Sequence, residues 1–311
     1  MEEVYMKTPE GIDAPPGTVC RLKKSLYGLK QASRQWFSNL NEVLLALEYV
    51  QSENDYSLYI KHTTTGIVIV VYVDDILLTG SDTTQILHPK QVLDVKLSIK
   101  DVGQLHFFLG FEIGHVDGVV TMSQCKFANE LIEESGILQQ SVSSKLPVTP
   151  LPLNTKLFPD EGALLDAPEY YRGILGKLNF LTNKRHVLSF AVQTLSQFMQ
   201  HPRDSHLTTL THLLHYVKSI VGQGIIVQES TKLFLAGYSD SDWVVCRTTR
   251  RSVTGYIITL GNSPISYKSK KQTTISRSSS EAEYRVMAQA GAKVTWLVRL
   301  LQDLGVSDLT P

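Results

Sequence analysis

The spacing of apolar residues predicts a helix early in the chain and a hairpin after it. In residues 32–50, apolar side chains recur every three or four positions and form one stripe. Residues 56–61 have the composition of a short strand, and residues 66–73 are a β-branched run without a polar face, which is typical of a strand covered on both sides. Asp74 and Asp75 interrupt this run before apolar residues resume. We therefore expect a hairpin with two carboxylates at its tip.

Helical and strand patterns alternate along the rest of the chain. Pro89 suits the first turn of a helix, so we predict a helix from Pro89 to about Lys100. Residues 141–168 contain five prolines and few periodic apolar positions, which indicates a linker that crosses the surface. The other predicted elements are a hairpin (105–113 and 118–122), helices at 127–135, 169–182 and 204–220, strands at 233–239, 253–260 and 264–268, and a long helix from Glu281.

The composition is that of an ordinary globular protein. The 311 residues are 42% hydrophobic and 19% charged, which is enough for about two domains and excludes wholesale disorder. Three cysteines lie far apart, so a disulfide scaffold and a cysteine-type zinc site are excluded. No signal peptide is visible, and the longest aliphatic stretch is too short to span a membrane. We expect an intracellular protein, in the cytoplasm or nucleus, that is neither secreted nor membrane-bound.

Charge is uneven along the chain, although 30 basic residues balance 30 acidic ones. No acidic residue occurs between Asp13 and Glu42 or between Asp242 and Glu281. Such windows suit a surface that contacts phosphates, but they are also consistent with solvated faces that bind nothing. The basic residues that we expect to bind nucleic acid are Arg21, Lys23, Lys24, Lys30, Arg34, Arg250, Arg251, Lys268, Lys270 and Lys271.

Asp74 and Asp75 are the strongest candidates for chemistry. Aspartate is a poor strand residue, and two adjacent carboxylates repel each other by roughly 1 kcal/mol even in water. A divalent cation removes that repulsion, and Mg²⁺ is commonly bound by one or two carboxylates together with substrate phosphates. The alternative is an ordinary hairpin turn, in which aspartate is common.

Several segments, in order along nearly the whole chain, resemble copia-type retrotransposon polyproteins. Residues 72–75, Tyr-Val-Asp-Asp, resemble the YxDD box of reverse transcriptases, and residues 22–36 resemble the stretch upstream of it. Residues 237–243 and 278–284 resemble the RNase H segment of the same polyproteins. Further matching segments are residues 3–9, 108–113 and 195–199.

This resemblance implies an α+β fold in three parts. Residues 1–145 would form an incomplete palm and thumb of a right-hand polymerase, residues 146–228 a helical connection, and residues 229–311 an incomplete RNase H-like α/β domain. The implied activity is that of an RNA-directed DNA polymerase with RNase H. Its cofactor would be Mg²⁺, and its partners would be deoxynucleoside triphosphates, an RNA template, a DNA primer and an RNA–DNA hybrid.

The resemblance also assigns residues to two catalytic, metal-binding sites. Asp74 would hold metal with Asp75 beside it, and Asp240 and Glu283 would be ligands in the RNase H-like part, with Asp242 as the local alternative to Asp240. Glu283 has a competing interpretation, because Ser280 and Glu283 have the spacing of a helix capping box, as do Ser278 and Glu281. Gln31 would line the template or incoming nucleotide, and residues 105–113 would lie near the primer strand.

The chain departs from the family at positions that matter for catalysis. The palm aspartate that the family carries upstream has no counterpart here, and neither does the third aspartate that follows the RNase H-like helix. We therefore expect this chain to be inactive alone. The alternatives are a non-catalytic nucleic-acid-binding remnant and a pseudogene-like product without selected function. Residues 184–187 and 244–246 replace the family's turn residues with bulkier ones, which would fit an unconstrained copy. The sequence does not indicate an oligomeric state.

Overall fold

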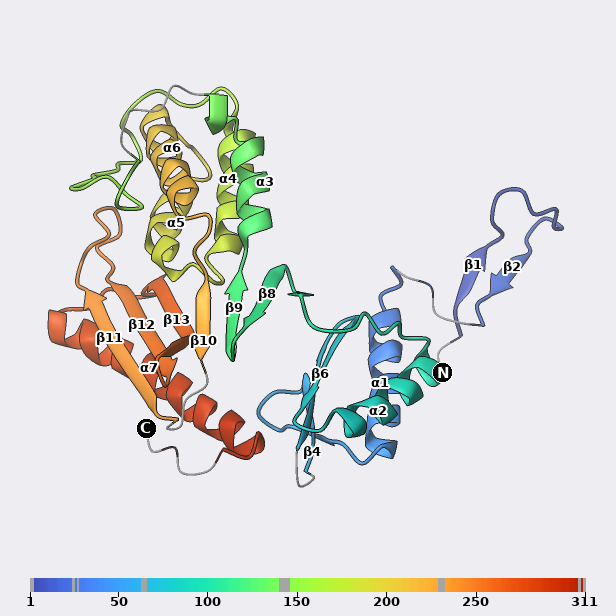
Figure 1. Ribbon diagram of the computed structural model, residues 1–311. Coiled ribbons are helices and arrows are strands. Elements are labelled where there is room, and N and C mark those ends of the chain that lie inside the picture. The colour runs from blue at the N-terminus through green and yellow to red at the C-terminus, as the bar shows by residue number, and fades with distance from the viewer. Residues whose placement is uncertain are drawn as a thin grey trace. The chain divides into compact units, whose positions relative to one another are not determined.

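The chain is a mixed α/β protein with two compact units, residues 1–103 and 104–311 (Figure 1). The structure, a computed structural model, describes residues 3–23, 26, 28–62, 66–139, 146–228, 233–306 and 309. Both units contain helices and sheets, which confirms the mixed composition that the sequence patterns predicted. Each unit is described by itself.

The first unit is built on an antiparallel sheet in the order β3-β4-β5-β6, and β1 and β2 form a separate antiparallel pair. Its elements are β1 (Tyr5–Lys7), β2 (Val19–Arg21), α1 (Ala32–Ala46), β3 (Val50–Gln51), β4 (Leu58–Lys61), β5 (Ile67–Tyr72), β6 (Asp75–Gly80) and α2 (Thr83–Leu97). The predicted early helix and the predicted hairpin are both confirmed.

The core of this unit lies between the two helices and the sheet. The α1 stripe, represented by Leu40 and Leu44, packs with Ile69 of β5 and with Leu93 of α2. Ile69 and Val71 are buried, whereas Val68 and Val70 of the same strand are only half-buried. The prediction that this strand is covered on both sides is therefore wrong for the described residues. An apolar run without a polar face can still belong to a strand with one covered face.

Helix α2 begins six residues earlier than predicted. Asp82 caps it, since the backbone N–H of Thr84 donates to Asp82 Oδ1 at 2.9 Å. This capping interaction satisfies a donor at the helix start that would otherwise be unpaired. Pro89 consequently lies inside the helix, where it is buried, rather than in its first turn. Pro89 is therefore not the start signal of this helix, because the capping residue Asp82 begins it instead.

The first part of the second unit combines a small sheet with a helical bundle. Its elements are β7 (Phe107–Phe108), β8 (Phe111–Val116), β9 (Val119–Ser123), α3 (Cys125–Glu134), the 3₁₀ turns Ile137–Gln139 and His186–Leu188, α4 (Pro168–Leu181), α5 (Ser189–Ser196), α6 (Asp204–Ser219) and β10 (Ile225–Gln228). The strand order is β10-β9-β8-β7. Helices α3, α4, α5 and α6 share one core, with Leu131, Leu178, Leu195 and Leu210 inside it. Helix α5 and strand β10 were not predicted.

The predicted scarcity of regular elements in residues 141–168 is confirmed over the part of this segment that the structure describes before α4. Residues 146–167 contain no helix or strand; one bridge, between Leu164 and Arg203, connects them to the bundle. Arg203 also donates to the carbonyl oxygens of Pro159 at 2.7 Å and Gly162 at 2.6 Å. Residues 141–145 lie outside the described residues.

The second unit ends in an antiparallel sheet of order β11-β12-β13 with a long helix packed against it. These elements are β11 (Leu235–Asp242), β12 (Val253–Leu260), β13 (Ser263–Lys271) and α7 (Ser279–Asp303). Leu235 and Ile258 of the sheet pack with Leu297 and Leu301 of α7. Gly261 has a φ of 57°, which suits the turn between β12 and β13.

Candidate metal centres and nucleic-acid interface

The Asp74–Asp75 pair lies at the tip of the β5–β6 hairpin. Tyr72 pairs with Asp75 across the hairpin, so Val73 and Asp74 form a two-residue turn. Val73 has a φ of 54°, in the left-handed region that β-branched residues rarely occupy. The first central position of such a turn favours glycine when its φ is positive. The tip therefore carries local backbone strain; a residue held in such a sparsely populated conformation typically costs about 1–3 kcal/mol.

Both carboxylates at this tip face solvent. Asp74 and Asp75 are exposed, as is the neighbouring Tyr72. Exposed carboxylate oxygens can enter the coordination shell of a hard cation without a prior rearrangement of the fold. The position of the pair is as the sequence predicted; its role in metal binding stays a prediction.

The second candidate site lies where α7 begins beside the end of β11. The backbone N–H of Ser241 donates to Glu283 Oε1 at 3.1 Å, so the Glu283 carboxylate lies beside the residue that separates Asp240 from Asp242. Asp240 and Asp242 are both exposed, and alternation along the strand places them on the same face. The structure thus brings the predicted residues of this site into one corner of the second unit.

The capping question for Glu283 has a clear answer. The cap of α7 is Ser278, whose Oγ accepts from the backbone N–H of Glu281 at 3.1 Å. Glu281 in turn accepts from the backbone N–H of Arg277 at 2.7 Å. Ser278 and Glu281 therefore satisfy the helix start. The Glu283 carboxylate is turned toward β11 instead of back to the helix start.

The carboxylates of this corner influence one another. Asp242 is exposed, but the protein atoms around its carboxylate displace part of the surrounding water; this partial desolvation raises its pKa, and the negative charge of Asp240 raises it further. A divalent cation would relieve that repulsion, which is the same argument that applies to Asp74 and Asp75. Among the described residues, however, no three His, Cys, Asp or Glu side chains gather into a group that could hold one metal ion.

A buried polar network fixes this corner, and the sequence analysis missed it. Gln272 is 5% exposed, and its Nε2 donates to Ser241 Oγ at 3.3 Å and to the Ala282 carbonyl at 3.2 Å. Its Oε1 accepts from Ser276 Oγ at 2.8 Å. Gln272 therefore links the end of β11 to the first turn of α7, close to Glu283. A single glutamine after a strand carries no pattern that would have revealed this role.

The residues of the first unit that were predicted to bind nucleic acid lie in different environments. Arg21 forms an ion pair with Glu3 at 3.1 Å, so its charge is partly neutralised by an acid outside the acid-free sequence window. Lys23, Lys30 and Arg34 are exposed. Gln31 directly precedes α1 and is half-buried. Lys24 lies outside the described residues.

The predicted basic residues of the second unit are better placed to attract an anion. Lys268 Nζ donates to Gln289 Oε1 at 2.9 Å, and Lys271 Nζ donates to Gln197 Oε1 at 2.8 Å. Lys270 is exposed; in the loop after β11, Arg250 is exposed and Arg251 is half-buried. None of these five cations forms an ion pair with a described carboxylate. Their charges are therefore available to a ligand.

The segment that the resemblance places near the primer is anchored by aromatic packing. Gly110 has a φ of 77°, and a Cβ there would lie 2.7 Å from Phe180 Cζ. The rings of Phe111 and Phe180 stack with centroids 6.4 Å apart, and Lys184 Nζ lies 4.9 Å from the Phe111 centroid. Glycine is therefore needed at position 110 for both conformation and close approach. The role at the primer stays a prediction.

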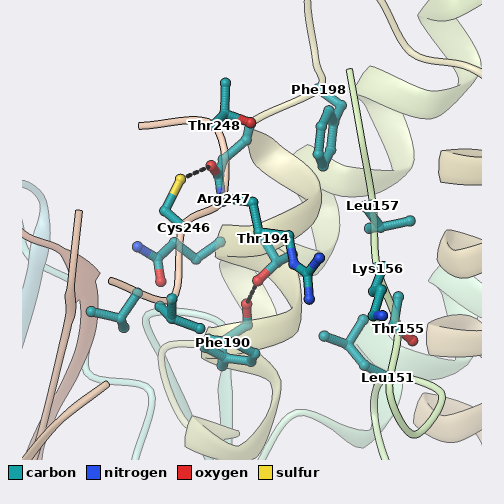
Figure 2. Close-up of a pocket in the computed structure, with 14 residues that line it drawn as sticks. Leu151, Thr155, Lys156, Leu157, Phe190, Thr194, Phe198, Cys246, Arg247 and Thr248 are labelled. Carbon is teal, nitrogen blue, oxygen red and sulfur yellow. Dashed lines mark hydrogen bonds between the residues drawn. The ribbon is translucent and has the colours of Figure 1, made fainter. Parts of the chain in front are cut away.

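A cavity of about 120 Å³ lies beside Cys246 in the loop after β11. Figure 2 shows the Cys246 thiol hydrogen-bonded to a neighbouring side chain, which is Gln197 Oε1 at 3.3 Å. Burial acts to raise the pKa of Cys246, but the hydrogen bond from Thr249 and the charge of Lys271 outweigh it and lower the pKa. The thiol is therefore more acidic than an ordinary cysteine. No site residue had been predicted here.

No helix in the described segments is both long and apolar enough to cross a membrane.

A match to a protein-family model and similarities to individual proteins agree with one another. A family described as reverse transcriptase (RNA-dependent DNA polymerase) matches residues 1–150. The retrovirus-related Pol polyprotein from transposon RE2 of Arabidopsis thaliana is 40% identical over 308 residues, which cover 98% of this chain and 21% of that polyprotein. A protein assigned to transposon Ty5-1 of Saccharomyces cerevisiae is 32% identical over 289 residues, which cover 91% of this chain and 92% of that protein.

An uncharacterized mitochondrial protein of Arabidopsis thaliana is also similar. It is 38% identical over 234 residues, which cover 73% of this chain and 93% of that protein. The chain spans about a fifth of the length of the RE2 polyprotein, since 21% of that polyprotein is covered. No solved structure gives a significant match.

Proposed function

Because the chain belongs to the reverse transcriptase family of copia-type retrotransposon Pol polyproteins, we propose that it supplies the acidic hairpin of an RNA-directed DNA polymerase. The observation that carries this proposal is the exposed Asp74–Asp75 tip on the β5–β6 hairpin. The proposed reaction is transfer of a deoxynucleotide to the 3′ end of a DNA primer, directed by an RNA template. The proposed substrates are deoxynucleoside triphosphates.

Mg²⁺ is the cofactor that suits this tip, because two exposed carboxylates offer the hard oxygen ligands that the ion prefers. Asp74 and Asp75 would hold it. When bound, the ion would neutralise charge that develops during phosphoryl transfer. The contribution of the chain itself is to keep both carboxylates at a solvent-exposed position, next to Tyr72.

We further propose an RNase H-like role for residues 229–311, a connecting role for residues 146–228 and a polymerase role for residues 1–145. The antiparallel sheet β11-β12-β13 with α7 packed against it supports the first assignment. Support for its site comes from Glu283, whose carboxylate reaches the backbone between Asp240 and Asp242. In this proposal, Asp240 and Glu283 would hold Mg²⁺ during cleavage of the RNA strand of a hybrid.

We expect little polymerase activity from this chain by itself. Asp74 and Asp75 are neighbours on one hairpin, so they approach an ion from one side only, and the described residues provide no group of three ligands. Loss of a charged ligand that acts in the transition state costs several kcal/mol, which corresponds to about a thousandfold or more in rate. A further carboxylate from another strand would therefore be required.

Primer extension on a homopolymer template tests this proposal. The assay compares the chain with a version extended at its N-terminus by a family-like strand that ends in aspartate. We expect extension only by the longer version, and we expect Asp74→Asn to abolish it. Asp117→Asn is the matched control, because Asp117 is an exposed aspartate in another hairpin turn. Activity of the longer version that survives Asp74→Asn would overturn the proposed role of the hairpin.

A second function, nucleic-acid binding without catalysis, is favoured by one observation. The basic side chains of β13 and of the loop after β11 have no described carboxylate partner. If about half of the twelve basic residues in the two acid-free windows contact phosphates, the log–log slope of affinity against salt should be about −4 to −5. Titration of a primer–template duplex at several salt concentrations measures this slope. Affinity that does not depend on salt would contradict the idea.

A further inference from the structure

Two histidines of α6 hold the two ends of a segment that contains no helix or strand, residues 149–158. His212 Nε2 lies 3.0 Å from the carbonyl oxygen of Thr149, and His206 Nε2 lies 3.1 Å from the carbonyl oxygen of Phe158. A carbonyl oxygen can only accept a hydrogen bond, so both Nε2 atoms carry a hydrogen and donate it. We call residues 149–158 the lid.

The lid forms one wall of the cavity beside Cys246. Leu151, Thr155, Lys156 and Leu157 line this cavity from the lid, and Cys246 lines it from the loop after β11. Figure 2 shows these lid residues and Cys246 on opposite sides of the cavity. Cys246 is 8% exposed. A movement of the lid away from the helical bundle would therefore expose the thiol.

Phe158 connects the His206 end of the lid to the loop that carries Cys246. The Phe158 carbonyl oxygen accepts from His206. The guanidinium carbon of Arg247, the residue after Cys246, lies 5.7 Å from the centroid of the Phe158 ring. Loss of the hydrogen bond to His206 therefore acts on a residue that contacts the loop with the thiol.

His206 is fully buried, and both of its ring nitrogens form hydrogen bonds. Besides the bond from Nε2 to the lid, Nδ1 accepts from the backbone N–H of Arg203 at 3.1 Å and completes a capping box at the start of α6. The ring of Phe198 stacks on the imidazole, with 3.9 Å between the centroids. Only the neutral imidazole can accept at Nδ1 while it donates at Nε2. A proton on Nδ1 would place one N–H group against another.

The charged groups near His206 come from both segments that it joins. Arg203 and Asp204 lie at the start of α6, and Glu161 lies just after the lid. Burial lowers the pKa of His206, and the charge of Arg203 lowers it too, whereas the bond to Phe158 and the two acids act to raise it. The contribution of His206 to stability is therefore complete above about pH 6.5 and is lost as the pH falls. Arg203 also holds two carbonyl oxygens beyond the lid, but arginine stays charged and cannot supply a pH response.

We propose that neutral His206 holds the lid closed over Cys246, and that protonation of His206 releases the lid and opens the cavity at acidic pH. The Thr149 end stays attached, because protonation of His212 leaves the hydrogen on its Nε2 in place. The inference does not depend on the proposed function, since the lid and its histidines belong to neither acidic site.

Hydrogen exchange of the full chain at pH 7.5 and pH 5.0, measured by mass spectrometry, tests the release of the lid. After correction for the intrinsic effect of pH on exchange, lid peptides of the wild type should exchange about fivefold faster at pH 5.0, because a buried hydrogen bond is lost. Peptides of α4 should keep their protection, since the core of the bundle stays folded.

His206→Gln separates the proton from the side chain. A glutamine at this position of a capping box can accept from the Arg203 N–H but does not take up a proton in this pH range, so the lid should stay closed at both pH values. His206→Ala should open the lid at both pH values. His201→Gln is the matched control, because His201 is an exposed histidine that precedes α6, and it should keep the response of the wild type.

Modification of Cys246 by dithiodipyridine, with its peptide quantified by mass spectrometry, tests whether the lid controls the cavity. The wild type and His206→Gln should react at the same rate at pH 7.5, and the wild type about fivefold faster at pH 5.0. The two proteins are compared at the same pH because the rate also depends on the thiolate fraction. Cys125, which lies on α3, is the internal reference and should react equally in both proteins.

Each outcome supports or overturns a stated part of the inference. A response that is present in the wild type and in His201→Gln but absent in His206→Gln supports it. An unchanged lid in the wild type, or an equal change in His206→Gln, would show that His206 does not hold the lid closed. Equal labelling of Cys246 in both proteins at pH 5.0 would show that the lid does not control the cavity. Loss of protection in α4 together with the lid would mean that the whole bundle unfolds and no separate lid exists. If circular dichroism shows that His206→Ala does not fold, the comparison of the wild type with His206→Gln still tests every step.

Discussion

Asp74 and Asp75 are neighbours at the tip of one hairpin, whereas Asp240 and Glu283 lie in one corner of the second unit because α7 begins beside the end of β11. The first pair needs only one hairpin, and its position follows from an apolar run broken by two acids. The second pair needs a strand, a helix cap and a buried glutamine to come together. Local sequence therefore specifies the first site, while packing specifies the second.

The two sites also rest on separate cores, and this difference has the largest expected effect. Ile69→Ala should lower the unfolding free energy of the first unit by about 2–5 kcal/mol, because Ile69 is fully buried there. Ile258→Ala should do the same in the second unit. Calorimetry with two resolved transitions measures both effects. A shift of both transitions by either change would show that the two sites depend on one core.

The second site depends on its helix cap, which can be removed by itself. Ser278→Ala should lower the unfolding free energy of the second unit by about 1 kcal/mol, since the N–H of Glu281 would lose its acceptor. Ser280→Ala is the matched control, because Ser280 is an exposed serine that does not cap the helix. Urea unfolding of the two variants shows which serine caps the helix. A larger loss from Ser280→Ala would reverse the capping assignment and return Glu283 to a capping role.

The first site depends on a strained turn, and relief of that strain should stabilise it. Val73→Gly should raise the unfolding free energy of the first unit by about 1 kcal/mol, because the strain removed exceeds the entropy that glycine adds. Val50→Gly, at an exposed strand position without positive φ, should instead lower it. Chemical denaturation of both variants checks the opposite signs. Destabilisation by Val73→Gly would mean that the turn is not strained.

The smallest expected effect concerns the repulsion within the second site. The pKa of Asp242 is raised in the folded protein, so its proton binds more tightly there than in the unfolded chain. Its contribution to stability is therefore full below about pH 4 and is lost as the pH rises through the folded pKa. Asp242→Asn should stabilise the second unit at pH 7 by less than about 1 kcal/mol, because the side chain is exposed and water screens it.

Thermal unfolding of Asp242→Asn and of wild type at pH 3 and pH 7 measures this effect. The difference between the two proteins should be larger at pH 7 than at pH 3. An equal difference at both pH values would show that neither desolvation nor the charge of Asp240 raises the pKa of Asp242 appreciably.

Part of the fold could be predicted because its signals are local. The β5–β6 hairpin follows from a break in an apolar run, and the β12–β13 turn from Gly261 and Asn262. Helix α5 was missed because eight residues give too short a stripe to recognise. The role of Gln272 depends on groups distant in sequence, and one-dimensional patterns contain no trace of such contacts. The metal and nucleic-acid roles of the predicted residues stay predictions.

The bulky residues 184–187 would fit a sequence copy that is free of selection. Their contacts do not support that interpretation. Arg185 is 4% exposed, and its Nη1 donates to the carbonyl of Ile220 at the end of α6 at 2.7 Å. Lys184 lies over the ring of Phe111, and the rings of His186 and Tyr267 are 5.3 Å apart. Bulky residues at a family turn are therefore compatible with a specific packing role. By contrast, the departure from the family at residues 244–246 does strain the backbone, because Val244 has a φ of 56°.

The short interval between the α7 cap at Ser278 and the carboxylate at Glu283 constrains how this region can change in evolution. One inserted or deleted residue between them would turn Glu283 by about 100° around the helix axis and away from β11. A residue inserted into the β5–β6 turn would similarly shift the register and move the strand's side chains to opposite faces. Copies of this sequence that still function should therefore differ by substitutions in these two intervals, whereas copies released from selection should also accumulate gaps there.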